Sequence, residues 1–217
     1  MTTPDSPATI RTYGGRSADE RNADRRRRLL DAALELFGTE GYAAVTVERV
    51  CTTAKVSTRH YYQLYRNKEE ALLDLYASIT AEAFAAAQAS LEAAAGQHFH
   101  DRVTSAVRAY LTPILADPLT VRVAFVEVVG VSPQVEDRRL QFRSGIVALF
   151  EDEGAAAVER GEIGPRDFRF LALAFIGAIN VIVHEWGRDP DRMDASLLDE
   201  KVCRLAIDII EGAHPPN

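Results

Sequence analysis

Cysteine is scarce in this sequence: its 217 residues include two, Cys51 and Cys203, which lie 152 positions apart. Two thiols so far apart predict no disulfide framework, as is usual for proteins of a reducing compartment. The simplest interpretation of each is a small buried side chain, and a redox switch is the less favoured alternative for Cys51.

Long hydrophobic runs are also missing. The longest nearly uncharged apolar run, residues 170–183, has 14 residues, which is fewer than the roughly 20 that a helix needs to cross a bilayer. The first residues, MTTPDSPATIRTYGG, contain no apolar core of the kind a signal peptide has. We therefore expect a cytoplasmic protein without a membrane partner.

Signatures of catalysis and of metal binding are absent from the sequence. It contains no glycine-rich phosphate loop, no Gly-x-Ser-x-Gly and no distinct nucleophile–base pair. His98 and His100 are close enough in sequence to suggest metal ligands. Side chains two positions apart on a helix point in different directions, however, and no further His or Cys cluster supports a metal site. We therefore expect neither an enzyme, nor a metal site, nor a cofactor.

Charge is unevenly distributed along the chain. Residues 1–68 contain 12 Lys and Arg against 8 Asp and Glu, a net charge of +4, while residues 69–217 contain 13 against 24, a net charge of −11; together these give the total of −7. A basic amino-terminal third joined to an acidic remainder indicates that one end binds a polyanion. The arginines at 25–28 are either a solvated basic face or contacts to phosphates or the minor groove.

Apolar residues recur at three- and four-residue spacing along most of the chain, which predicts an all-α fold. Residues 1–16 lack this pattern and are expected to form a flexible tail. Ser17 can begin the first helix in a capping box with Glu20, and Gly38 and Gly41 are expected to end it. Later helices are predicted over residues 68–95, 101–115, 119–131, 135–160 and 168–186, followed by a final helix with Leu198, Val202, Leu205 and Ile209 on one face.

Residues 46–68 contain two short helices joined by a short turn. Thr46 and Ser57 each have a hydroxyl suited to cap a helix, and Asn67 is expected to cap the following one, with Glu70 completing a capping box. The second helix, TRHYYQLY, contains no acid, and nearly all of its side chains are hydrogen-bond donors or stacking groups. Two helices joined in this way form a helix-turn-helix, whose second helix can lie in the major groove of DNA.

The run LLDAALELFGTEGYAAVTVERVCTTAKVSTRHYYQLYRNKEEALL, residues 29–73, resembles the N-terminal DNA-binding domain of the TetR family of transcriptional regulators. The similarity extends over about 45 residues without a gap, and it includes the Gly41-Tyr42 turn. Two positions depart from the family pattern: Lys55 stands where glycine is usual, and Cys51 stands where alanine is usual. Neither departure removes a side chain that would face DNA.

The resemblance implies a protein that binds double-stranded DNA at a palindromic operator. Arg59 is expected to form a bidentate pair with guanine, and Tyr62, Lys68 and the Thr46 hydroxyl are expected to contact phosphates. Tyr61 either touches a thymine methyl or packs inward. The predicted DNA-binding residues are Thr46, Ser57, Thr58, Arg59, His60, Tyr61, Tyr62 and Lys68.

The resemblance also implies a domain plan, with a helix-turn-helix domain at residues 17–67 and a helical effector-binding and dimerisation domain at residues 68–217. The resemblance implies that the last two helices form a four-helix bundle with a second copy. The sequence itself predicts burial, because the first of these helices is apolar on nearly every side. Glu127, a lone acid in an apolar run, either meets a cationic ligand or pairs with Arg122 or Arg143. The expected effector is a hydrophobic small molecule, and its candidate contacts are Tyr110, Phe125, Glu127, Phe142, Asn180, His184 and Trp186.

Three functional alternatives remain open at this point. The resemblance favours a repressor that an effector releases from DNA, whereas an activator of the same fold would have the same sequence features. A helical adaptor that binds protein through residues 46–65 is the third. Loss of nucleic-acid affinity as salt rises would separate a DNA reader from such an adaptor.

Overall fold

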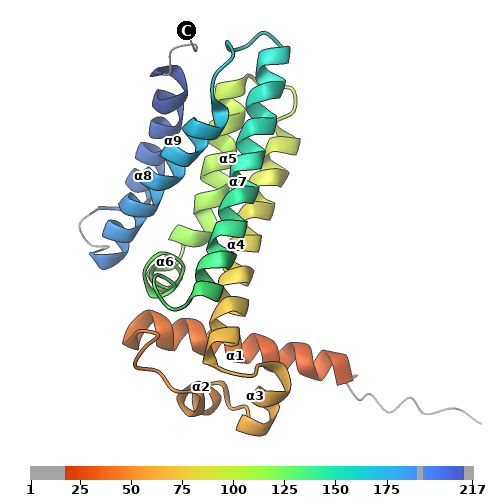
Figure 1. Ribbon diagram of the computed structural model, residues 1–217, viewed down its shortest axis with the longest axis vertical. Helices are drawn as coiled ribbons and strands as arrows, with labels where there is room; N and C mark the ends of the chain where they lie inside the picture. The colour runs from red at the N-terminus through yellow and green to blue at the C-terminus, as the bar shows by residue number, and fades with distance from the viewer. Residues whose placement is uncertain (1–17, 190–192, 213–217) are drawn as a thin grey trace, which may run out of the picture.

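The computed structural model describes residues 18–189 and 193–212. The expected tail at residues 1–16 and the capping residue Ser17 therefore lie outside the described residues. Every regular element within the described ranges is helical, which confirms the all-α fold class (Figure 1). The elements are α1 (Ala18–Glu40), α2 (Val47–Ala54), α3 (Thr58–Leu64), α4 (Lys68–Ala93), α5 (Phe99–Leu115), α6 (Pro118–Arg122), the π-helical turn η1 (Val123–Glu127), α7 (Pro133–Glu159), α8 (Phe168–Arg188) and α9 (Ala195–Gly212).

Helices α1 to α3 form a head at one end of the molecule, and α4 to α9 form the body. In Figure 1, α1 lies across the lower end, with α2 and α3 beneath it, and α4 rises from the head into the body. The core of the head continues into η1 and the turn that follows it, so the two parts share one apolar cluster. Its members include Leu29, Phe37, Val45, Val50, Cys51, Tyr61, Leu72, Val123, Ala124 and Val128.

Capping hydrogen bonds set the helix boundaries in the head as the sequence predicts. The Thr46 Oγ1 accepts from the backbone N–H of Arg49 at 3.2 Å, and the Ser57 Oγ accepts from His60 N–H at 3.4 Å. Asn67 Oδ1 accepts from Glu70 N–H at 2.8 Å. The Glu70 carboxylate does not return this bond to Asn67. It accepts instead from the backbone N–H of Arg66 at 2.7 Å, so the expected box is displaced by one residue.

Lys55 ends α2 in the left-handed conformation, with φ 52° and ψ 43°, so the turn tolerates a side chain where glycine is usual. We expect Lys55→Gly to raise the free energy of unfolding by about 0.5–1 kcal/mol. Relief of the left-handed conformation, worth ~1–2 kcal/mol, exceeds the added entropy of glycine in the unfolded chain. Urea unfolding measures this gain. Lys55→Ala retains the Cβ atom and is expected to show no such gain, and equal gains in both variants would contradict the explanation.

The sequence predicts that Gly38 and Gly41 end α1. Gly38 does not, because the helix continues to Glu40, whereas Gly41 ends it at φ 88°. Gly38 instead allows the backbone of α1 to approach α6 closely. A Cβ atom on Gly38 would lie 2.8 Å from the Cβ of Leu119, a distance that side chains do not tolerate. The missing side chain therefore fixes how closely the head packs against the body.

Within one chain helix α8 is buried on one face only, so the burial on all sides predicted from the sequence would require a second subunit. One face packs against neighbouring helices through residues such as Phe175 and Val183, while Phe170 and Val181 on the opposite face are 66% and 65% exposed. By length and composition alone α8 could cross a membrane, but its packed face belongs to the core of the body. The exposed apolar stripe of α8 consists of Phe170, Leu173, Gly177 and Val181.

The apolar stripe predicted on the last helix packs in part within the same chain, and its members Leu205 and Ile209 are half-buried. Leu198 and Val202 on α9 are buried within the same chain, in the cluster that includes Val103 and Val107 of α5. They are therefore not available to a second subunit. Cys203, on the same helix, is buried and free, as is Cys51 in the head, which confirms their interpretation as small buried side chains.

Candidate nucleic-acid interface and ligand cavity

One face of α3 carries exposed side chains without a single carboxylate. Thr58, Arg59, Tyr62 and Gln63 are exposed on this helix, and the capping residue Ser57 is exposed at its start. Gln63 is absent from the predicted site. Its position could have been found from the helical period, because residues 58, 59, 62 and 63 fall on one face. This face can donate several hydrogen bonds to a polyanion.

The prediction that Tyr61 contacts DNA is wrong. Its side chain has no exposed surface, and its hydroxyl donates a hydrogen bond to the carbonyl oxygen of Asn67 at 3.0 Å. Burial raises the pKa of Tyr61 above its ordinary value. Tyr65 is likewise buried, and its hydroxyl donates to Asp74 at 2.7 Å. Both tyrosines therefore attach α3 to the first turns of α4.

His60 is half-buried beside the cap of α3. Its Nδ1 lies 2.9 Å from the Ser57 hydroxyl, whose oxygen also accepts from the His60 backbone N–H. The imidazole is thus held at the start of the helix, next to Arg59. The Ser57 hydroxyl therefore fixes the position of the His60 ring in the first turn of α3.

Lys68 has intramolecular partners that the sequence did not reveal. Its Nζ donates to the carbonyl oxygens of Tyr42 at 2.6 Å and Val45 at 2.7 Å, and it lies 4.2 Å from the centre of the Tyr42 ring. Burial lowers the pKa of this ammonium. Two of its three donors therefore stabilise the turn between α1 and α2, and the phosphate contact stays a prediction for the third.

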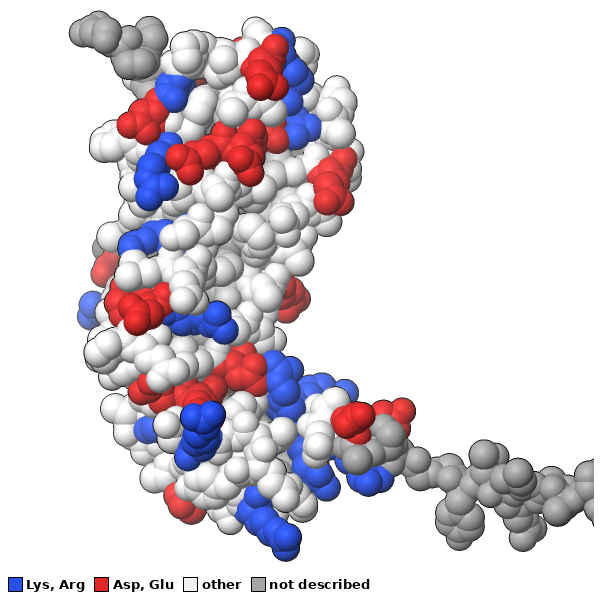
Figure 2. Space-filling model, turned by 45° about the vertical axis from the view of Figure 1, so that its right-hand side comes forward, with Lys and Arg blue, Asp and Glu red and all other residues white. Residues whose placement is uncertain are grey.

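The arginines at 25–28 form intramolecular contacts near the start of α1. Arg26 makes two hydrogen bonds with the Asp74 carboxylate on α4, and Arg28 pairs with Asp24 at 3.3 Å. The Arg26 guanidinium helps to lower the pKa of Asp74 against the opposing effect of burial. Figure 2 shows Lys and Arg side chains gathered at this end of the molecule, beside the residues drawn in grey.

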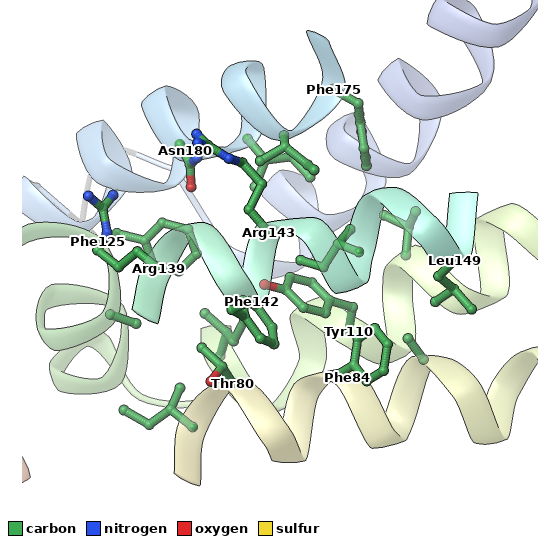
Figure 3. A pocket seen from close by; sticks show the side chains of 18 of the residues that line it. Thr80, Phe84, Tyr110, Phe125, Arg139, Phe142, Arg143, Leu149, Phe175 and Asn180 are labelled. Carbon is green, nitrogen blue, oxygen red and sulfur yellow. The ribbon is translucent and has the colours of Figure 1, made fainter. Parts of the chain in front are cut away.

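The body contains a cavity between α4, α5, α7 and α8, with about 1070 Å³ of empty space including its open mouth. Figure 3 shows side chains from several helices converging on it. Four of the predicted effector contacts line it: Tyr110, Phe125, Phe142 and Asn180. The sequence missed other lining residues that come together only in the fold, among them Tyr76, Thr80, Phe84, Arg139, Arg143, Leu149 and Phe150.

Three predicted effector contacts do not line the cavity, because each makes a contact elsewhere. The Nδ1 of His184 lies 3.2 Å from the carbonyl oxygen of Phe125, and the Trp186 indole donates to the carbonyl oxygen of Met193 at 2.7 Å. Glu127 faces the head, as described below. The proposed cationic ligand for Glu127 is therefore not supported, whereas the alternative pair with Arg122 is confirmed at 3.2 Å.

Glu127 joins the body to the head. One carboxylate oxygen accepts the backbone N–H of Tyr42 at 2.7 Å, and the other accepts from the Arg122 guanidinium. A Cβ atom on Gly41 would lie 3.4 Å from this carboxylate. Phe125, two residues earlier on η1, lines the cavity. One short element therefore touches both the cavity and the turn that leads to α2.

A second, smaller apolar cavity adjoins the first, with about 440 Å³ of empty space. The two share the lining residues Ala106, Val107, Leu149 and Phe150. The only charged side chain among its lining residues is Glu153, whose carboxylate makes two hydrogen bonds with Arg102 at 2.7 and 2.5 Å. The second cavity is therefore lined by apolar side chains and by one charge that is already paired.

Two protein-family models match the chain. Residues 29–75 match the model for bacterial regulatory proteins of the tetR family, and residues 96–210 match the model for a tetracyclin repressor-like C-terminal domain. The HTH-type transcriptional regulator YhgD of Bacillus subtilis (strain 168) is 24% identical over 175 residues, which cover 79% of this chain and 88% of that protein.

Solved structures share the fold over most of the chain. The fatty acid degradation regulator FadR from Bacillus halodurans superposes with a TM-score of 0.76 at 17% identity, covering 84% of this chain and 94% of that one. FadR from Bacillus subtilis, solved in complex with stearoyl-CoA, gives a TM-score of 0.75 at 18% identity, covering 83% and 96%. At these identities the likeness concerns the fold alone.

Proposed function

Because this chain belongs to the TetR family of bacterial transcriptional regulators, we propose that it is a cytoplasmic, homodimeric repressor that a hydrophobic effector releases from a palindromic operator. The observation that carries the proposal is the position of η1, which connects an apolar cavity in the body to the turn before α2. Binding of stearoyl-CoA by the Bacillus subtilis FadR supports an effector site within this fold.

On this proposal the exposed face of α3 enters the major groove. Arg59 pairs with guanine, Thr58 and His60 lie near base edges, and Gln63 is added as a candidate for adenine. Tyr62, Ser57 and the Thr46 hydroxyl contact phosphates. A single short helix offers few contacts, so a symmetric pair of heads is needed for specific binding.

Selection of bound sites from random duplex DNA tests the proposal. We expect a motif with dyad symmetry, with half-sites about one helical turn or more apart. Affinity for the selected site should fall steeply as salt rises, because Lys and Arg side chains release counterions from the phosphates. No enrichment of any motif, with a folded protein, would overturn the assignment of α3 as the reader.

The dimer is proposed to form through the exposed apolar stripe of α8. A Cβ atom on Gly177, at its centre, would meet open space, so a partner helix can approach the backbone there. We expect Val181→Glu to convert the dimer into a monomer, because a carboxylate would be buried at the interface without a partner. Analytical ultracentrifugation measures the change.

Val129→Glu is the matched control for this experiment. Val129 is also exposed but lies in the turn between η1 and α7, outside the exposed apolar stripe of α8, so the same change is expected to leave the dimer intact. If the Val181→Glu protein still sedimented as a dimer, α8 would not be the interface.

The effector is proposed to act through η1. A molecule in the cavity contacts Phe125, and a shift of η1 moves Glu127 and with it the Tyr42 backbone. A ligand that prefers the shifted arrangement changes the population of head positions and hence the spacing of the two α3 helices.

A further inference from the structure

We propose that the cavity takes a long-chain amphiphile with a single anionic head group, whose head binds at Arg143 and Arg139 and whose tail runs along α7 into the second cavity. The identification of this molecule as the effector rests on the proposed function. The binding of this molecule to the protein does not depend on the proposed function, and it can be measured without DNA.

The charges at the cavity favour one anion. Arg139 and Arg143 lie four residues apart on α7, and Arg139 is paired with Glu136 at 2.5 Å. No carboxylate within residues 18–189 and 193–212 forms an ion pair with Arg143. The formally charged lining residues are Glu136, Arg139 and Arg143, so the lining carries one uncompensated positive charge. This contrasts with the net charge of −11 over residues 69–217.

The geometry places this charge beside a second polar group. Figure 3 shows the Arg143 side chain extending from α7 toward Asn180 on α8. A guanidinium has several donors suited to a carboxylate or a phosphate, and the Asn180 amide can add another. Arg143 is exposed and Arg139 is half-buried, so the head group would lie at the open mouth of the cavity. A cationic head would be repelled there, and a neutral head would lack the charge-assisted hydrogen bonds that an anion makes.

Away from these groups the lining becomes apolar and continues over a long distance. On α7 the lining residues beyond Arg143 run to Phe150, which corresponds to about 10 Å at ~1.5 Å per residue. The second cavity then extends the path toward Phe99, Phe168 and Ile210. An elongated space with one charged end and an apolar remainder fits a single alkyl chain better than a compact ring system.

Calorimetric titration of the full-length protein tests this proposal, with dodecanoate, hexadecanoate, hexadecanoyl-CoA and the matching alcohols as probes below their micelle concentrations. We expect a long-chain anion to bind about tenfold more tightly than the matching alcohol, because a hydrogen-bonded ion pair replaces a neutral contact. Arg143→Gln should remove this preference. Tighter binding by hexadecanoate than by hexadecanoyl-CoA supports a single small anionic head, whereas tighter binding by the CoA thioester, whose head carries several phosphates, would overturn it.

Arg138→Gln is the matched control, because it makes the same change on the same helix at a residue outside both apolar cavities. It is expected to leave the preference unchanged. Ala106→Phe tests the tail, since Ala106 lines both cavities: it should weaken hexadecanoate more than dodecanoate. Circular dichroism checks that each variant is folded.

Equal binding of acids and alcohols by the unmodified protein would overturn the proposal, as would equal effects of the Arg143 and Arg138 variants. A protein that binds its selected operator but none of these probes would also overturn it, while leaving the proposed DNA-binding function intact.

Discussion

Arg59→Ala is expected to flatten the preference of the protein among DNA sequences while leaving the fold unchanged. Arg59 is exposed at the second position of α3, so its removal creates no cavity. A bidentate pair with guanine contributes about 1–3 kcal/mol of discrimination per base, which corresponds to roughly 5- to 150-fold in relative affinity. Titration of the selected operator and of a variant changed at one guanine measures the loss.

Tyr62→Phe is the comparison for the Arg59 experiment. It removes one exposed hydroxyl proposed to contact a phosphate, so it should weaken binding to all sequences by a similar factor. Lys68→Ala is a poorer comparison than the sequence suggests, because it would also remove the hydrogen bonds to Tyr42 and Val45. If the Arg59 and Tyr62 variants lost affinity equally on both DNAs, Arg59 would not read a base.

Glu127→Ala is expected to disconnect the cavity from the head. The Glu127 side chain is 15% exposed, and a hydrogen bond from a backbone N–H to such a carboxylate contributes about 1.5–3 kcal/mol. We therefore expect the Tyr42 amide to exchange its hydrogen at least about tenfold faster. Any compound that releases the unmodified protein from its operator should release this variant less effectively.

Arg122→Ala serves as the control for Glu127. It removes the second partner of the carboxylate but leaves the bond to Tyr42 in place, so amide exchange at Tyr42 should change much less. If the Glu127 variant retained both the slow exchange of Tyr42 and the full response to a releasing compound, η1 would not connect the two sites.

Local features of the head could be predicted from the sequence. The caps formed by Thr46, Ser57 and Asn67 involve residues within three positions of one another, and such contacts depend on spacing alone. The burial of Cys51 can also be predicted locally, because the helical period decides which face of α2 is apolar.

Contacts between distant segments could not be predicted in this way. Tyr42 and Glu127 are 85 positions apart, and the Lys68 ammonium meets a carbonyl 26 positions earlier. Arg139 and Arg143 look like surface residues in the sequence, and their place at the cavity depends on how α7 packs beside α4 and α8. A local pattern indicates which residues are apolar or charged, but the packing of whole helices decides which of them meet.

The close approach of Gly38 to Leu119 has a mechanical consequence. Helix α1 contains 23 residues and is therefore about 34 Å long at ~1.5 Å per residue, and it touches α6 near its carboxyl end. Because Gly38 has no side chain between the two backbones, a small displacement of α6 is transmitted directly to the carboxyl end of α1. Near its other end the two hydrogen bonds from Arg26 to Asp74 attach α1 to α4, so such a displacement would turn α1 about this attachment.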